Sequence, residues 1–335
     1  LKALHVKKQS SLLIPAFMCQ STLDPLVKFG YKIVYQDIEY DLSINIDTLK
    51  DNIIKHDIKA VLVVNYFGFF SSNIDKIYHL CREMEVIVIQ DNSHNFMSHY
   101  SFASKVENAD FSIYSIRKTL PISDGGALKF NQKIIDAYLV DGLVLDPPID
   151  SCIERLSVFL SDLKYIFSRY CELAISYSGI INIYSTVIDR LKFKYRSSGN
   201  VPFCNLKPRP QNKSILLDKY ISNPKYLDSM KTDMIKNYFF ITQSMIDIGY
   251  QPFFKNLDRA CTPQYAIFID DSGGSLIKFL RKNKIAATSW PGDEMPTEIK
   301  IKKSQFPIAN KLNQNLFLLP IHSSLSLRRV RRIID

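Results

Sequence analysis

The sequence predicts an α/β fold whose larger domain is a mostly parallel sheet covered by helices on both faces. Short apolar runs alternate with stretches in which apolar residues recur every three to four positions, as in amphipathic helices. The runs are continuously apolar, as in strands that are buried on both faces. Polar residues follow the ends of these runs, where parallel sheets bind ligands. We therefore expect a ligand site at the carboxyl edge of the sheet.

The first part of the chain supplies this alternation. Strands are expected over 11–17, 31–38, 60–67 and 86–90, with helices over 21–29, 45–54 and 73–84. Gly30 stops the first helix and Gly68 ends the third strand. Asn45 or Asp47 can cap the second helix, because short polar side chains accept hydrogen bonds from N–H groups of a first helical turn.

The pattern of apolar residues changes twice further along the chain. Residues 136–227 carry long helical patterns and then a passage rich in Pro and Asn, which predicts a helical connector or cover. From residue 228 onward, helices are expected over 231–245 and 275–284 and strands over 264–269 and 285–291. We predict a large domain over 1–135 and a small C-terminal α/β domain over 228–335. Because the chain begins at Leu1 rather than Met, we expect further residues before it.

Composition and charge narrow the class of protein. A chain of 335 residues with 46% hydrophobic and 23% charged residues is typical of a globular protein with a large core. No apolar run approaches the roughly 20 residues that span a bilayer, so no membrane partner is expected. The net charge of +10 comes from Lys and Arg spread without a basic block, which favours a solvated basic surface over a nucleic-acid partner. A phosphorylated or nucleotide-linked substrate also suits this charge.

The six cysteines are scattered, and no two of them form a Cys-x-x-Cys pair. This spacing favours neither a disulfide framework nor a zinc site, so no metal site is predicted. A reducing cytoplasm is the expected location.

Two strand ends carry an acid and an amine. The run 86–90 ends at Asp91, and the run that begins at Phe111 leads to Lys118 and then to Gly125 and Gly126. An enzyme that uses pyridoxal 5′-phosphate (PLP) needs this pair. The carboxylate keeps the pyridine nitrogen protonated, and the amine holds the aldehyde as a Schiff base. The competing interpretations are a turn or helix-capping Asp, an exposed loop lysine and an ordinary glycine turn.

The segments around these residues resemble the DegT-like sugar aminotransferases, a family of fold-type-I PLP enzymes. Asp91-Asn-Ser-His94 fits the family signature Asp-x-x-Gln/His. The later segment Ser115…Lys118…Asp124-Gly125-Gly126-Ala127 fits the signature Ser…Lys…(Asp/Glu)-Gly-Gly-Ala. Segments 14–17, 65–68 and 306–325 also resemble the family, so the likeness covers about two-thirds of the chain. The fold that this resemblance implies is a fold-type-I αβα sandwich with a smaller C-terminal domain.

The resemblance implies a cofactor role for several residues. Lys118 would form the Schiff base and transfer protons, and Asp91 would bind the pyridinium. His94 would lie near the phenolic oxygen of the ring, with a structural histidine as the alternative. Ser115 would bind the phosphate, and Ser112 is the alternative because Ser115 lies closer to Lys118 than is usual in the family.

Other matching residues would shape the site around the cofactor. Gly125 and Gly126 would allow positive φ or a close backbone approach near the lysine turn. His322 and Tyr66 are expected on the substrate side. Cys19 stands where many family members carry an aromatic residue that packs on the ring.

The resemblance implies transamination, in which an amino group passes from an amino acid such as glutamate to a keto sugar, expected to be nucleotide-linked. It also implies a homodimer. Two alternatives stay open: a PLP enzyme of another reaction type, such as a dehydratase or desulfurase, and a non-catalytic relative that serves in binding or assembly. The second alternative rests on Cys19 and on the family's upstream phosphate-binding Gly-Thr/Ser turn, which has no counterpart in this chain.

Overall fold

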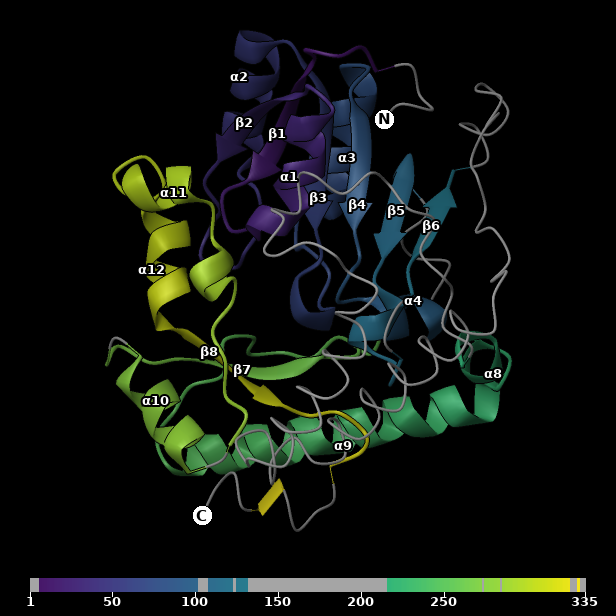
Figure 1. Cartoon of the computed structure of the whole chain (residues 1–335), viewed down its shortest axis with the longest axis vertical. Coiled ribbons are helices and arrows are strands. Elements are labelled where there is room, and N and C mark those ends of the chain that lie inside the picture. Colours follow the sequence, from purple (N-terminus) through teal and green to yellow (C-terminus); the bar gives the residue numbers. More distant parts are fainter. Residues whose placement is uncertain are drawn as a thin grey trace, which may run out of the picture.

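The computed structural model describes residues 6–101, 108–122, 125–131, 216–272, 274–283, 285–325 and 330–331. It contains a six-stranded sheet in the N-terminal half and a two-stranded sheet in the C-terminal half (Figure 1). The predicted connector over 136–227 lies outside the described residues up to residue 215.

The large sheet has the strand order β2-β1-β3-β4-β5-β6. All neighbouring strands pair in parallel except β5 and β6, which are antiparallel. The strands are β1 (Ser11–Pro15), β2 (Lys32–Gln36), β3 (Ile58–Val64), β4 (Ile87–Asp91), β5 (Phe111–Tyr114) and β6 (Ala127–Phe130). The predicted mostly parallel sheet is therefore confirmed.

Three helices connect parallel strands where the apolar periodicity predicts them: α1 (Gln20–Lys28), α2 (Ile46–His56) and α3 (Ile74–Glu83). The short α4 (Phe96–Ser101), which follows β4, was not predicted. Asn45 caps α2, because its side-chain oxygen accepts a hydrogen bond from the Thr48 N–H at 3.0 Å. α2 and α3 pack on one face of the sheet, where Leu49 and Ile77 share a core cluster with Val61 and Val88.

The C-terminal half packs around a long helix and a two-stranded sheet. Its elements are α8 (Leu217–Ile221), α9 (Pro224–Asp247), β7 (Tyr265–Ile269), α10 (Ser275–Lys282), α11 (Thr297–Ile301), α12 (Pro307–Asn315) and β8 (Leu316–Pro320). The antiparallel pair β7–β8 lies between α9 and the large sheet (Figure 1). α9 begins seven residues before the predicted helix start at 231, because Pro224 occupies its first turn and Asn223 caps the Tyr226 N–H.

The strand predicted over 285–291 is wrong. Only Thr288 makes a β-bridge there, to Leu318 of β8, and the chain then turns through a cis Trp290–Pro291 peptide bond. The Ala287 N–H bonds the Ile285 carbonyl at 2.8 Å, so the backbone bends before it can extend the ladder. The apolar residues of this segment are buried because the segment packs Trp290 against the N-terminal half, and not because they form a strand.

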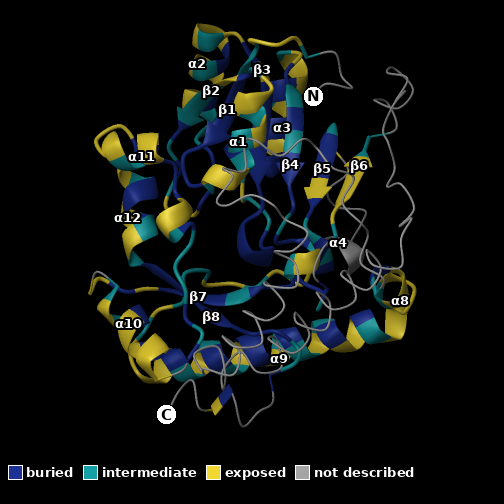
Figure 2. Cartoon of the chain, viewed as in Figure 1, coloured by how far each residue is buried: buried dark blue, intermediate teal, exposed yellow. Residues whose placement is uncertain are grey.

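The two halves share one large core. Ile14 and Val64 at the carboxyl edge of the large sheet belong to the same buried cluster as Phe268 of β7 and Phe317 of β8. Buried residues accordingly line both sides of the junction (Figure 2). The domain boundary predicted at 227/228 falls inside α9 and remains a prediction. Among the described helices, none combines the length and apolarity that a membrane span requires.

Candidate active site

The predicted acid and amine lie at the same edge of the large sheet. β4 ends at Asp91, which pairs in register with Ile113 of the parallel strand β5. The chain leaves β5 at Tyr114 and forms a single 3₁₀ turn over Ile116–Lys118. Because the carboxyl ends of parallel strands meet at one edge, Asp91 and the Lys118 turn become neighbours.

Lys118 faces His94, with Lys118 Nζ 3.0 Å from His94 Nε2. Burial lowers the pKa of Lys118 below that of an ordinary lysine, while the nearby negative charge of Asp91 acts in the opposite direction. Burial, followed by the positive charge of Lys118, holds the pKa of His94 well below its usual value. His94 is therefore a neutral imidazole at neutral pH, and its Nε2 can accept a hydrogen bond from the amine.

Asp91 is nearly buried, with 9% of its surface exposed. Its Oδ1 accepts a hydrogen bond from the Ser93 N–H at 2.8 Å, which forms a turn immediately after the strand. The turn-forming interpretation of Asp91 thus holds for one oxygen. Among the described residues, no hydrogen bond reaches the other oxygen, so it can accept one from a ligand at the sheet edge.

Aromatic side chains from both halves enclose this group. The Phe67 ring stacks on His94, with centroids 5.5 Å apart and an interplanar angle of 13°. Trp290, from the C-terminal half, makes an edge contact with His94 at 5.7 Å and with Phe17 at 4.9 Å. Phe67 and Trp290 were not predicted as site residues from the sequence. The one available signal was that Trp290 is the single tryptophan of the chain and precedes a proline.

Tyr66, predicted on the substrate side, belongs to this aromatic wall. Its hydroxyl donates a hydrogen bond to the Phe17 carbonyl at 2.7 Å. Burial raises the pKa of Tyr66 well above its ordinary value, so the phenol stays protonated. The ring also contacts Trp290 at 5.4 Å. Tyr66 is therefore placed beside the site with its hydroxyl bound to the backbone.

Cys19 and Glu294 form a second, partly exposed side of the site. Burial raises the pKa of the Cys19 thiol to about 12, the Lys118 charge opposes this rise, and Glu294 adds to it by charge and by a hydrogen bond. The thiol is therefore neutral. Glu294 comes from the 3₁₀ turn Gly292–Glu294 of the C-terminal half and also acts electrostatically on Lys118. No sequence motif identifies Glu294 as a site residue.

The two candidate phosphate serines lie in different places. Ser112 pairs in register with Gln90, and its hydroxyl donates a hydrogen bond to Gln90 Oε1 at 3.2 Å. Because side chains alternate along a strand, this places Ser112 on the face opposite to Asp91. Ser115 instead opens the lysine turn, where its carbonyl accepts the Lys118 N–H at 3.1 Å. The structure therefore favours Ser115 over Ser112.

Gly125 and Gly126 lie beside the lysine turn. Gly125 adopts φ +147°, and a Cβ there would lie 3.0 Å from Ile122 Cδ1. Its carbonyl accepts a hydrogen bond from the Arg117 N–H at 3.3 Å. A Cβ on Gly126 would lie 3.2 Å from the Tyr114 carbonyl. Positive φ thus accounts for Gly125 and a close backbone approach for Gly126, whereas Asp124 of the same motif lies outside the described residues.

His322 lies just after β8. Its Nδ1 is 2.6 Å from Ser324 Oγ, and its carbonyl accepts a hydrogen bond from Asn237 Nδ2 of α9 at 3.2 Å. These contacts tie His322 to its own turn and to α9. Its place on the substrate side remains a prediction.

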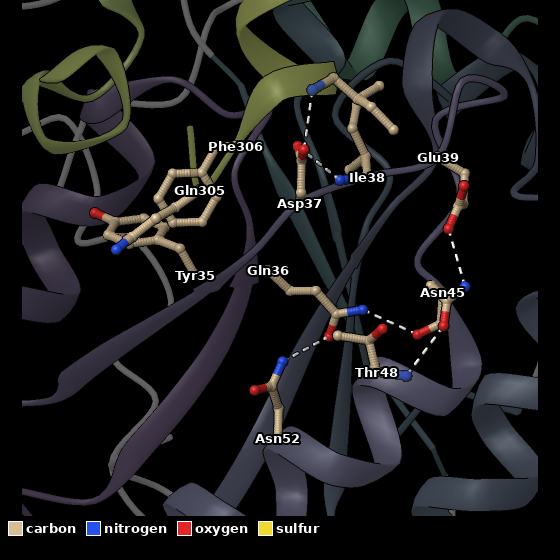
Figure 3. Close-up of a pocket in the computed structure, with 11 residues that line it drawn as sticks. Tyr35, Gln36, Asp37, Ile38, Glu39, Asn45, Thr48, Asn52, Gln305 and Phe306 are labelled. Atoms are coloured by element: carbon tan, nitrogen blue, oxygen red, sulfur yellow. Dashed lines mark hydrogen bonds between the residues drawn. The ribbon is translucent and has the colours of Figure 1, made fainter. Parts of the chain in front are cut away.

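A cavity of about 360 Å³ lies elsewhere, at the end of β2. Figure 3 shows hydrogen bonds among several of the residues that line it. Gln36 Nε2 donates to the Asn45 carbonyl at 2.9 Å, and Asn52 Nδ2 donates to Gln36 Oε1 at 3.2 Å. None of the site residues predicted from the sequence lines this cavity, and the amides of Gln36, Asn45 and Asn52 already have partners.

Comparison with known proteins confirms the resemblance. Residues 1–140 match the sequence profile of the DegT/DnrJ/EryC1/StrS aminotransferase family. A UDP-4-amino-4,6-dideoxy-N-acetyl-beta-L-altrosamine transaminase from Campylobacter jejuni is 32% identical over 135 residues, which cover 39% of this chain and 35% of that protein. A GDP-4-keto-6-deoxy-D-mannose 3-dehydratase from Escherichia coli is 30% identical over 89 residues, which cover 26% of this chain and 22% of that protein. The chain thus matches about a third or less of the length of these curated relatives.

Solved structures show the same fold. An aminotransferase of this family from Brucella abortus superposes with a TM-score of 0.62 at 15% identity, covering 100% of this chain and 80% of that one. The sugar aminotransferase CalS13 from Micromonospora echinospora gives a TM-score of 0.64 at 12% identity, covering 99% and 81%. At these identities the likeness concerns the fold alone. The predicted fold-type-I aminotransferase fold is confirmed.

Proposed function

We propose that this chain is a PLP-dependent aminotransferase that moves an amino group from an amino acid, expected to be glutamate, to a nucleotide-linked keto sugar. One observation carries the proposal: the Lys118 amine lies 3.0 Å from His94 at the sheet edge where Asp91 ends the neighbouring strand. The relative from Campylobacter jejuni, a transaminase of a UDP-linked amino sugar, supports the substrate class.

The residues at this edge fit the cofactor. A partly buried lysine with a lowered pKa supplies more neutral amine at a given pH than an exposed lysine does. The free oxygen of Asp91 suits a cationic ring nitrogen, and Phe17, Phe67 and Trp290 provide apolar walls. When bound, PLP supplies an electron sink for a carbanion on the substrate.

The side chains at the site then have separate roles in the reaction. Lys118 Nζ holds and returns the proton that leaves the substrate carbon. His94, kept neutral by burial, accepts a hydrogen bond from Nζ and so orients the amine. Ser115, at the start of the lysine turn, is the proposed phosphate ligand. Glu294 and Cys19 border the side from which a substrate reaches Lys118.

We further propose that the protein works as a homodimer in the cytoplasm, with no nucleic-acid partner. The family resemblance supports the dimer. The spread of Lys and Arg without a basic block supports the absence of a nucleic-acid partner. The scattered cysteines support a reducing compartment. The proposed domain division stays at 1–135, 136–227 and 228–335.

An amino-transfer assay tests the reaction. Purified protein with PLP, ¹⁵N-labelled glutamate and a panel of UDP- and GDP-linked 4-keto sugars should give a ¹⁵N-amino sugar and 2-oxoglutarate. Lys118→Arg should abolish transfer, at least about 10³-fold, because a guanidinium cannot deprotonate. Lys278→Arg, the same change at an exposed lysine of α10, should leave the rate unchanged.

Three outcomes would contradict the proposal. Loss of a sugar hydroxyl without nitrogen transfer would assign dehydration, the reaction named for the Escherichia coli relative. Full activity in the Lys118→Arg variant would show that Lys118 takes no part in the chemistry. Absence of both transfer and PLP binding would favour the non-catalytic alternative.

A further inference from the structure

Gln264 crosses from the C-terminal half to the lysine turn. It directly precedes β7, and its side chain is buried, with 7% of its surface exposed. Gln264 Nε2 donates one hydrogen bond to the Lys118 carbonyl at 3.0 Å and another to Thr119 Oγ1 at 2.8 Å. Both N–H groups of one amide are thus used on Lys118 and the residue after it.

The same segment also holds the loop behind His94. The Gln264 backbone N–H donates to the Phe67 carbonyl at 2.8 Å, and Phe67 is the ring that stacks on His94. Thr262 N–H donates to Ser98 Oγ at 2.8 Å, and Ser98 Oγ in turn donates to the Gly68 carbonyl at 2.9 Å. Residues 262–264 therefore bond both to the backbone of Lys118 and to that of Phe67, the residue whose ring stacks on His94.

Packing alone does not explain an amide at this position. Among the described residues, Gln264 Oε1 is buried without a hydrogen-bond partner. A buried polar atom without a partner is unfavourable relative to an apolar side chain of the same shape. The amide makes two N–H hydrogen bonds to the lysine turn, which an apolar side chain could not make.

We propose that Gln264 is a positioning residue that fixes the Lys118 turn, so that the C-terminal half of the chain sets the place of the amine relative to His94 and Asp91. Gln264 touches the backbone of Lys118 and not its amine, so its effect on the reaction passes through Lys118. The inference rests on the proposed role of Lys118 and adds the residue that holds it in place.

The test compares Gln264→Met with wild type. Methionine keeps the length and apolar volume of the side chain but cannot donate to Lys118 or Thr119. Trace acetylation across a pH series, in protein without PLP, followed by mass spectrometry gives the titration midpoint of each lysine. In Gln264→Met the Lys118 midpoint should rise toward about 10.4, the ordinary value, because a loosened turn admits water. Exposed lysines such as Lys278 should not move.

A second readout uses the cofactor. PLP affinity should fall about tenfold in Gln264→Met, as expected when two buried hydrogen bonds no longer hold the turn. Gln243→Met removes the amide of an exposed glutamine of α9 and should change neither quantity. Because the acetylation midpoint is measured without PLP, it tests Gln264 even if wild type fails to bind PLP, which would count against the proposed function alone.

An unchanged Lys118 midpoint together with unchanged PLP affinity in a folded Gln264→Met variant would overturn the proposal. If that variant does not fold, variants of Thr119 test the proposal instead. Thr119→Val removes the hydroxyl that accepts from Gln264 and should raise the Lys118 midpoint, whereas Thr119→Ser keeps the hydroxyl and should restore it. Equal midpoints in these two variants and wild type would also overturn the proposal.

Discussion

Lys118 and His94 illustrate how burial sets chemistry at the scale of single residues. Both are bases with pKa values lowered chiefly by burial, and they face each other at 3.0 Å. If burial acted alone, Lys118 would lose its proton more easily than it does, because the charge of Asp91 favours the ammonium. The balance between burial and Asp91 therefore decides how much neutral amine is present at a given pH.

This balance predicts the effect of Asp91→Asn on Lys118. Removing the negative charge takes away a force that raises the Lys118 pKa, so the pKa should fall further. Neutral amine should then persist to lower pH than in wild type. The Lys118 acetylation midpoint without PLP should move down, while Asp51→Asn, the same change at an exposed position of α2, should leave it in place. An upward movement of the Lys118 midpoint would contradict the placement of Asp91 near Lys118.

Sequence patterns located only those site residues that follow a strand. Asp91 and Lys118 could be predicted because Asp91 directly follows one apolar run and Lys118 closely follows another, and the carboxyl ends of such runs must lie at one sheet edge. Gln264, Trp290 and Glu294 reach the same place from more than 140 positions further along the chain than Lys118. Their position depends on how the two halves pack, which local periodicity does not encode.

At the scale of elements, prediction succeeded where the stabilising contacts are local. The α2 cap, Asn45, accepts from Thr48 three residues away, so the sequence alone identifies it. The start of α12 depends instead on Asp37, whose carboxylate accepts the Ile308 and Ala309 N–H groups at 2.9 and 3.0 Å. Asp37 lies after β2, in the other half of the chain, and no nearby residue signals this cap.

The segment 285–291 shows why apolar composition misled the strand prediction. Ile285 and Ala287 are buried, as strand residues would be, but the ladder to β8 holds only at Thr288. The next residues turn inward to place Trp290 against Phe17 and His94. Burial in this segment thus comes from contacts between the halves and not from strand pairing.

At the scale of the whole molecule, Gly68 lies where the backbones of the two halves approach each other closely. A Cβ at Gly68 would lie 2.2 Å from the Thr262 carbonyl oxygen, a distance that no side chain tolerates. The Ser98 hydroxyl bonds both of these backbones. The junction beside the lysine turn therefore depends on a glycine at this position.

Gly249 provides a matched control for this contact. Gly68 has φ +97° and Gly249 has φ +98°, but no atom lies within 4 Å of a Cβ at Gly249. Alanine at either position incurs the same backbone strain of about 1–2 kcal/mol. Gly68→Ala should lower the free energy of unfolding by about 1–3 kcal/mol more than Gly249→Ala, because it also forces the halves apart. Equal thermal or denaturant midpoints for the two variants would contradict this packing.

The central claim is that Lys118 is the amine that binds PLP, and borohydride reduction tests it most directly. Protein mixed with PLP should show a visible absorption band that borohydride bleaches. Peptide mapping should then find the reduced pyridoxyl group on Lys118, with none on the neighbouring Arg117 or on exposed lysines such as Lys278. A pyridoxyl group fixed on a different lysine would contradict the claim and would move the active site away from the edge formed by β4 and β5.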